Sequence, residues 1–359
     1  MLSYLHAFHA GNHADILKHA ALIQLLKKLN QKEAPYTFFD THAGSGLYST
    51  QGEKARKTGE AARGVLALAE CASQDKNTDR EASQAQNAGG QNLGPATDTG
   101  SSQKSAALSD YLDFVSPYLA RDLYPGSPLI ERAFLRPDDA HTICELHPQE
   151  FEALKENILQ AQEGAAPDSR LATDTGTKTK NAPHTQILKA DGLKTLIAQT
   201  PPKIKRGAVL IDPSYEEAAD YEAVKKTVIA VHKKWSAGII MIWYPLLAHR
   251  AAEIENMLES IIAAAKVQNA NTNILRAEFC VDAPQSHIEM SLEENAAAKA
   301  AAAGTSNNLG SPNAPRLYGS GILVVNSPWK LDEELDAALK HLSRVPGLAS
   351  EPSYSVEQI

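Results

Sequence analysis

The sequence predicts an α/β fold in which a mainly parallel sheet of seven strands is covered by helices on both sides. Seven short segments are apolar and rich in β-branched residues, and most are continuous apolar runs. Such runs are typical of strands that are buried on both faces. Helix-like segments separate them, and this alternation favours parallel strands joined by helices.

The expected elements follow one another along the chain at regular spacing. The strands are expected at residues 36–40, 141–146, 186–190, 208–212, 238–244, 274–281 and 321–326. The helices are expected at residues 14–30, 148–161, 192–198, 219–234, 249–270 and 331–343. In such sheets ligands bind beyond the carboxyl ends of the strands, so the residues that follow each strand are the functional candidates.

Three stretches of low complexity interrupt this order. Residues 72–107, 163–185 and 293–315 are rich in small and polar side chains. Their low hydrophobicity cannot offset the entropy of ordering, which predicts surface insertions. Because the segments beside the first stretch look helical, we expect a helical insert at 51–123. The catalytic domain would then comprise residues 1–50 and 124–359.

Composition and charge narrow the class of protein. The net charge of -8 excludes RNA binding by bulk electrostatics but allows a local basic surface. The three cysteines are far apart and show no metal or redox spacing. The longest apolar run, residues 238–248, is too short to span a bilayer. With a polar N-terminal segment, these features predict a cytoplasmic protein without a membrane partner.

A glycine-rich turn follows the first expected strand. Residues 40–46 read DTHAGSG, and glycines at such a turn let the backbone approach a ligand closely. The pattern is not GxGxxG, so it does not match the dinucleotide fingerprint. It suits a nucleoside that carries an amino acid. An ordinary tight turn is the alternative interpretation.

Acidic residues follow the second and third strands. A carboxylate at Glu145 can accept both ribose hydroxyls of an adenosine cofactor, and Asp191, before Gly192, can accept the adenine amine. The alternatives are a solvated strand end for Glu145 and a helix N-cap for Asp191.

The most informative motif is Asp212-Pro213-Ser214-Tyr215, directly after the apolar strand AVLI. An adenine amino group is a poor nucleophile because its lone pair is delocalised into the ring. The Asp212 carboxylate and the Pro213 carbonyl can accept its two N–H bonds, and Tyr215 can stack on the extruded base. A similar string at 326–329, NSPW, follows the last strand, but the expected strand order places Asn326 away from the ligand crevice.

The pattern resembles the Asp-Pro-Pro-Tyr motif of amino methyltransferases. Nearly the whole chain outside the insertions resembles the bacterial 23S ribosomal RNA adenine N6-methyltransferases of the RlmJ type. The strings that carry this resemblance are MLSYLHAFHAGNHADILKH at 1–19, YPGSP at 124–128, ELHP at 145–148, ADG at 190–192, WYP at 243–245 and PWKL at 328–331.

The resemblance implies a Rossmann-like class I fold that uses S-adenosyl-L-methionine, and a 23S ribosomal RNA substrate. It implies cofactor contacts from seven residues: His19, His42, Ser127, Glu145, Asp191, Gly192 and Asp212. Asp212 would also be the catalytic acceptor, with Pro213 and Tyr215 beside it. Tyr4 would meet the RNA, with His6 and Lys18 as neighbours of the target nucleotide. No obligate protein partner is expected.

Two positions depart from the family pattern. Ser214 replaces a second proline, which can loosen the turn that presents Asp212. Leu5 stands where a basic residue is expected, so one phosphate contact is in doubt.

Three alternatives stay open. The four-residue motif also serves DNA adenine methyltransferases, although no DNA-reading module is visible. A non-catalytic nucleic-acid binding protein could keep the same fold. The histidines at 6, 9, 13 and 19 invite a metal interpretation, but Gly11 and Asn12 interrupt a common helical face, and we expect no metal.

Overall fold

The computed structural model describes residues 4–75, 105–162, 184–283 and 317–359. Most of each predicted surface insertion, within 72–107, 163–185 and 293–315, lies outside these residues. At their edges, residues 106–107 already belong to a helix and residues 184–185 to a strand.

An eight-stranded sheet forms the centre of the molecule, with strand order β10-β8-β9-β7-β6-β1-β4-β5. Its strands are β1 (Thr37–Asp40), β4 (Ala140–Cys144), β5 (His184–Leu188), β6 (Gly207–Ile211), β7 (Ile239–Leu246), β8 (Ile274–Cys280), β9 (Gly319–Val325) and β10 (Ser353–Gln358). Neighbours from β5 to β7 are parallel, whereas β9 runs antiparallel to both β7 and β8. The predicted α/β fold with a mainly parallel sheet is confirmed.

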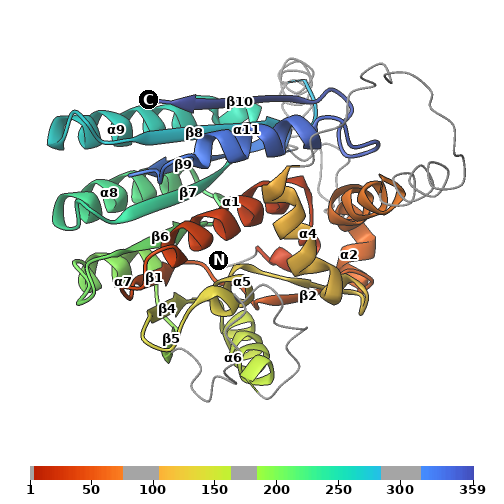
Figure 1. Ribbon diagram of the computed structural model, residues 1–359, viewed down its shortest axis with the longest axis horizontal. Helices are drawn as coiled ribbons and strands as arrows, with labels where there is room; N and C mark the ends of the chain where they lie inside the picture. The colour runs from red at the N-terminus through yellow and green to blue at the C-terminus, as the bar shows by residue number, and fades with distance from the viewer. Residues whose placement is uncertain (1–3, 76–104, 163–183, 284–316) are drawn as a thin grey trace, which may run out of the picture.

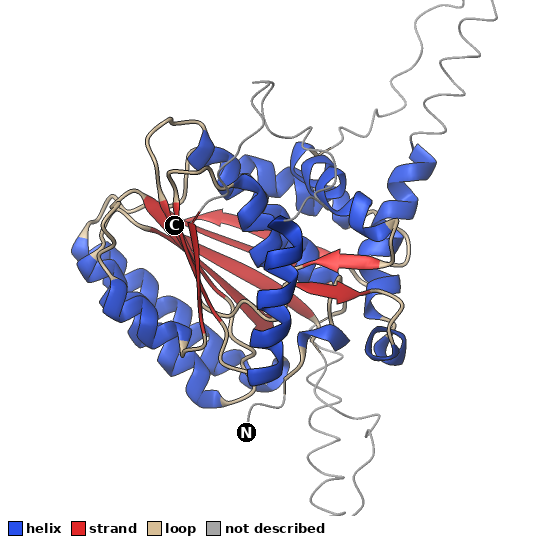
Figure 2. Ribbon diagram, turned by 90° about the horizontal axis from the view of Figure 1, so that it is seen from below, coloured by secondary structure: helices blue, strands red, loops and turns tan. Residues whose placement is uncertain are grey.

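Two layers of helices enclose this sheet (Figure 1 and Figure 2). One face carries α1 (His13–Asn30), α4 (Ala106–Leu119), α5 (Ser127–Phe134) and α11 (Leu331–Leu342), which share a core with the strands. The other carries α7 (Gly192–Gln199), α8 (Ala218–Lys234) and α9 (Ala251–Gln268), the last preceded by η3 (Ala248–Arg250). Helix α6 (Pro148–Gln162) packs with β4 and α5. These helices bury apolar side chains against the sheet, and α1 is buried around most of its surface.

The insert between β1 and β4 is built on a short antiparallel pair, β2 (Leu47–Ser49) with β3 (Leu123–Pro125). It contains α2 (Glu53–Thr58), the π-helical turn η2 (Ala62–Leu66) and α4. Since β1 and β4 still pair directly, the insert leaves the sheet intact. Helix α4 buries Tyr111 and Val115 completely in the main core. This half of the insert therefore belongs to the helical layer that packs on the sheet.

The order of strands reverses between β1 and β6. From β1 the chain proceeds outward through β4 and β5, and from β6 it proceeds the other way to β7. Ligands in open α/β sheets bind at the carboxyl edge where this reversal occurs. Asp40 ends β1 and Asp212 follows β6, so the fold brings both acids to this point.

Candidate active site

A cavity of about 1320 Å³ opens at the carboxyl edge of the parallel strands. Its walls come from the turns after β1, β4, β5, β6 and β7, from α1 and from the N-terminal segment. Of the site residues predicted from sequence, the following line it: Tyr4, His6, Lys18, His19, His42, Ser127, Glu145, Asp191, Gly192, Asp212 and Pro213. The structure therefore brings together residues from positions 4 to 213.

Glu145 is held firmly between two turns. Its carboxylate accepts the backbone N–H of Gly44 at 2.8 Å and that of His147 at 2.6 Å. Gly44 and Gly46 have φ of 59° and 74°, a region that favours glycine. Burial raises the pKa of Glu145, although these backbone donors oppose the change. The carboxylate keeps lone pairs that can accept hydroxyl groups from the cavity.

Asp40, at the end of β1, stabilises the glycine-rich turn that follows this strand. Its two oxygens accept the backbone N–H of His42 at 3.0 Å and the Ser127 hydroxyl at 2.7 Å. Glu131, fully buried beside it, contacts Nε2 of His141 at 2.8 Å. Burial and the nearby Glu131 raise the pKa of Asp40 well above its ordinary value. Burial also raises the pKa of Glu131 to about 8, so a proton is retained in this pair of carboxyls at neutral pH.

Asp191 and Gly192 have structural roles besides any contact with a ligand. Asp191 is the N-cap of α7, because its carboxylate accepts the backbone N–H of Lys194 at 3.1 Å. A Cβ on Gly192 would lie 1.9 Å from the carbonyl oxygen of Thr41. Only glycine therefore allows the β5 turn to pack against the β1 turn. Both residues still line the cavity.

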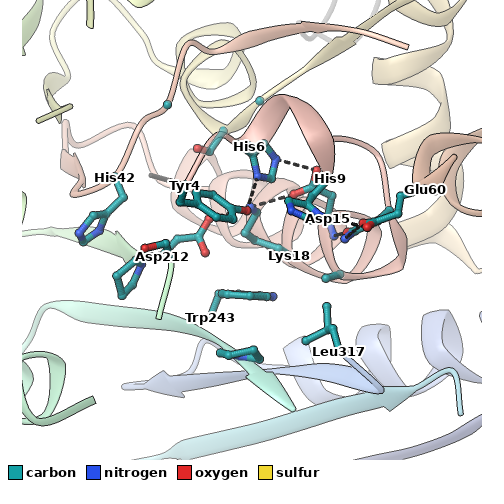
Figure 3. A pocket seen from close by; sticks show the side chains of 18 of the residues that line it. Tyr4, His6, His9, Asp15, Lys18, His42, Glu60, Asp212, Trp243 and Leu317 are labelled. Atoms are coloured by element: carbon teal, nitrogen blue, oxygen red, sulfur yellow. Dashed lines mark hydrogen bonds and ion pairs between the residues drawn. The ribbon is translucent and has the colours of Figure 1, made fainter. Parts of the chain in front are cut away.

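A chain of buried charges crosses the cavity floor (Figure 3). The Lys18 ammonium donates to Asp212 at 2.6 Å and pairs with Asp15 at 2.9 Å. Asp15 also contacts Nε2 of His6 at 2.9 Å and accepts the backbone N–H of Gly11 at 2.8 Å. Burial opposes charge on Lys18, but the two carboxylates outweigh it and raise its pKa well above the ordinary value. Burial raises the pKa of Asp212, and the Lys18 cation limits this rise.

Burial favours the uncharged form of two histidines that line the cavity, His19 and His42. Burial lowers the pKa of His19 to about 3 and that of His42 to about 4. Nδ1 of His19 contacts the Tyr124 hydroxyl at 2.7 Å, while its buried Nε2 makes no hydrogen bond among the described residues and lies 3.9 Å from Oδ1 of Asp15. His19, which lines the cavity, therefore has one ring nitrogen without a hydrogen bond among the described residues.

The N-terminal segment forms the outer wall and is anchored by the insert. Tyr4 stacks on His9, with ring centroids 5.6 Å apart, and its hydroxyl lies 3.0 Å from Nδ1 of His6. Glu60 of the insert contacts Nδ1 of His9 and accepts from the Asn12 amide, both at 2.9 Å. The insert thus fixes the segment that carries Tyr4 and His6 (Figure 3).

The expectation that Tyr215 stacks on a substrate base is not supported by its position. Its φ of 51° turns the ring away from the cavity and into the core. The ring is only 3% exposed and packs against Tyr221 and Trp243. Its hydroxyl donates to the backbone carbonyl of Trp243 at 3.0 Å. Tyr215 therefore supports the motif from below instead of facing a ligand.

Two residues of the cavity wall, Trp243 and Asp15, were not predicted as site residues from the sequence. Trp243, in the second half of β7, lines the cavity, and its buried indole N–H has no hydrogen-bond partner among the described residues. Asp15 is the shared neighbour of His6 and Lys18. The sequence could have indicated Asp15, because positions 15, 18 and 19 lie on one face of a helix.

Asn326 lies at the opposite edge of the sheet, as the strand order predicted. Since β9 is antiparallel to β7, its carboxyl end points away from the cavity. The Asn326 amide donates to the carbonyls of Ser236 and Gly238 at 2.8 and 2.7 Å. Within the described ranges, no cluster of histidine, cysteine or acidic side chains could hold a metal ion. Nor does this part of the chain contain a helix long and apolar enough to cross a membrane.

Comparison with known proteins identifies the family of this chain. The family model described as Ribosomal RNA large subunit methyltransferase D, RlmJ, matches residues 33–83 and 78–297, which is more than half of the chain. The chain belongs to this family. The resemblance found in the sequence motifs is thereby confirmed.

Relatives in this family match along nearly the full length. Ribosomal RNA large subunit methyltransferase J of Escherichia coli (strain K12) is 30% identical over 347 residues, which is 95% of this chain and 93% of the relative. The protein of the same name from Haemophilus influenzae is 28% identical over 365 residues, covering 100% and 99%. A crystal structure of a Legionella pneumophila protein shares the fold, with a TM-score of 0.64, 24% identity and coverage of 97% and 98%.

Proposed function

We propose that this chain transfers a methyl group from S-adenosyl-L-methionine to the N6 amino group of an adenine in 23S ribosomal RNA. The observation that carries the proposal is the arrangement around Asp212. One carboxylate oxygen is engaged by Lys18 at 2.6 Å, and the group follows β6 at the switch point of the sheet. Asp212 and Pro213 both line the cavity, where the other carboxylate oxygen and the Pro213 carbonyl would receive the amino group.

The groups on the β1, β4 and β5 turns fit S-adenosyl-L-methionine chemically. Glu145 is held by Gly44 and His147 and can accept ribose hydroxyls. Asp191 can accept the adenine amine, and Nε2 of His19, which makes no hydrogen bond among the described residues, can interact with a polar group of the cofactor. Carboxylates around the cavity also favour the positive charge of a sulfonium. When bound, this cofactor supplies a methyl carbon that is bonded to an electron-poor sulfur.

The residues of the chain then prepare the amine. Asp212 and the Pro213 carbonyl accept its two N–H bonds, which draws the nitrogen lone pair out of conjugation with the ring. Lys18 holds the Asp212 carboxylate in one orientation, so that the acceptor is in place before the substrate arrives. Formation of the C–N bond would break the bond between the methyl carbon and sulfur, and S-adenosylhomocysteine would leave with that electron pair. The surplus amino proton would then pass to the Asp212 carboxylate or to water.

Aromatic side chains are available to hold an extruded base. Tyr4 is 37% exposed at the outer wall, and Trp243 lies on the inner wall. Stacking between an aromatic ring and a base contributes about 1–3 kcal/mol. Trp243 thus takes the stacking role that the sequence motif suggested for Tyr215.

The RNA substrate is inferred from the relatives, both of which are named ribosomal RNA large subunit methyltransferases. The test is methyl transfer from labelled cofactor to protein-free 23S ribosomal RNA, DNA and assembled large subunits in parallel. Label in N6-methyladenosine from ribosomal RNA is the expected result. Label found only in DNA would show that DNA, and not ribosomal RNA, is the substrate. Cofactor binding without transfer to any of the three would indicate a non-catalytic binding protein.

A further inference from the structure

The α2 side of the insert carries a local concentration of positive charge. Four basic residues occur within residues 53–63: Lys54, Arg56, Lys57 and Arg63. All four are exposed. The acids in this stretch are Glu53 and Glu60, and Glu60 is already engaged by His9 and Asn12. We call these four side chains the insert cations.

Several other basic residues on the surface are neutralised by a nearby carboxylate, unlike the insert cations. Lys155, Lys194 and Lys225 each form an ion pair with a carboxylate three residues away. Among the described residues, none of the insert cations forms an ion pair. Lys54 lies over the Phe8 ring, and Arg63 donates to the Thr58 carbonyl, contacts that leave both charges uncompensated.

Their position connects them to the cavity. Arg63, Thr58 and Glu60 line its wall, so this surface continues into the opening. Helix α2 packs on η1 (His6–Phe8), the turn that carries His6 (Figure 1). The cavity floor is acidic, with Asp15, Glu145 and Asp212, and the whole chain carries a net charge of -8. A polyanion that delivers a base to this floor requires local positive charge beside the opening.

We infer that the insert cations form the surface that binds the phosphate backbone of the RNA next to the target nucleotide. This inference rests on the proposed function, because it assumes that the cavity receives a base from RNA. Phosphate contacts fix the position of a nucleic acid without reading its sequence. The insert would therefore contribute affinity and register, while the cavity selects the base.

Binding of a protein-free 23S ribosomal RNA transcript at several salt concentrations, with S-adenosylhomocysteine present, tests this surface. The variant is the double substitution Arg56→Gln and Lys57→Gln, since neither side chain has a partner among the described residues. For two lost contacts to unpaired RNA, the slope of log affinity against log salt should fall by about 1.4. The same slope predicts roughly 25-fold weaker binding at 0.1 M salt.

The matched control is Lys203→Gln with Lys205→Gln. Both lysines are exposed and lie just before β6, at the opposite edge of the sheet from the cavity. This control removes the same net charge and should keep the wild-type slope. Affinity for S-adenosylhomocysteine, measured by calorimetry, should be unchanged in both variants.

Two outcomes would overturn the inference. One is a wild-type slope in the Arg56/Lys57 variant, and the other is an equal loss in the Lys203/Lys205 control, which would indicate bulk charge. Failure of the proposed function is seen separately: the wild-type protein would bind the transcript but form no N6-methyladenosine. Methylation by the wild type together with an unchanged slope in the variant would overturn this surface alone.

Discussion

At the scale of single residues, Lys18 determines whether the cavity floor is stable. It is the cation between two buried carboxylates, Asp15 and Asp212. We expect Lys18→Met to lower the free energy of unfolding by about 3–5 kcal/mol, because it leaves these charges without their partner. Chemical denaturation at neutral pH measures the change.

The control on the same helix is Lys27→Met. Lys27 pairs with Asp110 but its side chain is 41% exposed, so its loss should lower the free energy of unfolding by no more than about 1 kcal/mol. Equal effects of the two substitutions would show that Lys18 does not stabilise the floor in the way described.

The buried pair of Asp40 and Glu131 predicts a dependence of stability on pH. Burial raises the pKa of Glu131 from 4.5 to about 8, while a hydrogen bond to Asp40 and the Lys18 cation oppose the rise. A carboxyl with a raised pKa binds more protons in the folded state. Its contribution to stability is therefore fully present below pH 4.5 and is lost as the pH rises through 8.

Glu131→Gln removes this titration while keeping the size of the side chain. Between pH 5 and pH 7 the wild-type free energy of unfolding should fall relative to the variant by up to about 3 kcal/mol. Denaturant titrations at both pH values measure the difference, with the exposed Glu259→Gln as control. Parallel profiles for wild type and Glu131→Gln would contradict the proposed shared proton.

The residues of the site were predictable to different degrees. Glu145, Asp191 and Asp212 each follow a strand, so the rule for carboxyl ends of parallel strands located them. Tyr215 was misplaced because a positive φ at this residue reverses the direction of its side chain. That backbone angle is set by packing against Tyr221 and Trp243 and is not visible in the motif.

At the scale of elements, the fit between the insert and the N-terminal segment depends on Gly64. A Cβ there would lie 2.1 Å from the Gly11 carbonyl oxygen and 2.8 Å from Cα of Asn12. We expect Gly64→Ala to push the segment outward and to lower the free energy of unfolding by about 1–3 kcal/mol. Hydrogen exchange should show faster exchange in amides 8–17.

Gly52→Ala serves as the comparison. Gly52 is the N-cap of α2 with a φ of -66°, and its added Cβ would meet Ser49 Cβ at 3.3 Å. Exchange in amides 8–17 should stay at the wild-type rate in this variant. If Gly64→Ala also left these amides protected, the insert would not hold the segment by this contact.

The long elements followed directly from the sequence, whereas short or polar ones did not. All seven predicted strands are present, and most of them are runs of apolar, β-branched residues. The eighth, β10, escaped prediction because Ser353–Gln358 is polar and lies half-exposed at the sheet edge. The pair β2 and β3 has three residues in each strand and depends on a partner about 75 positions away. Pairing at such a distance leaves no local signal.

At the scale of the whole molecule, the site results from the order of the strands. The sheet reverses direction between β1 and β6, and this places Asp40 and Asp212 at one edge with α1 above them. The alternation of strands and helices predicted this edge as the ligand side. It did not predict the fit of the N-terminal segment against the insert, because that depends on side-chain contacts between distant parts of the chain, such as Glu60 with His9.

The central claim is that this edge of the sheet methylates the adenine amino group with Asp212 as the acceptor. The most direct measurement is single-turnover formation of N6-methyladenosine in 23S ribosomal RNA by wild type and by Asp212→Asn. Thermal melting and calorimetric affinity for S-adenosylhomocysteine serve as controls for folding. We predict that the wild type forms N6-methyladenosine and that the variant is slower by about a hundredfold or more. A well-folded Asp212→Asn protein with a rate close to that of the wild type would contradict the account.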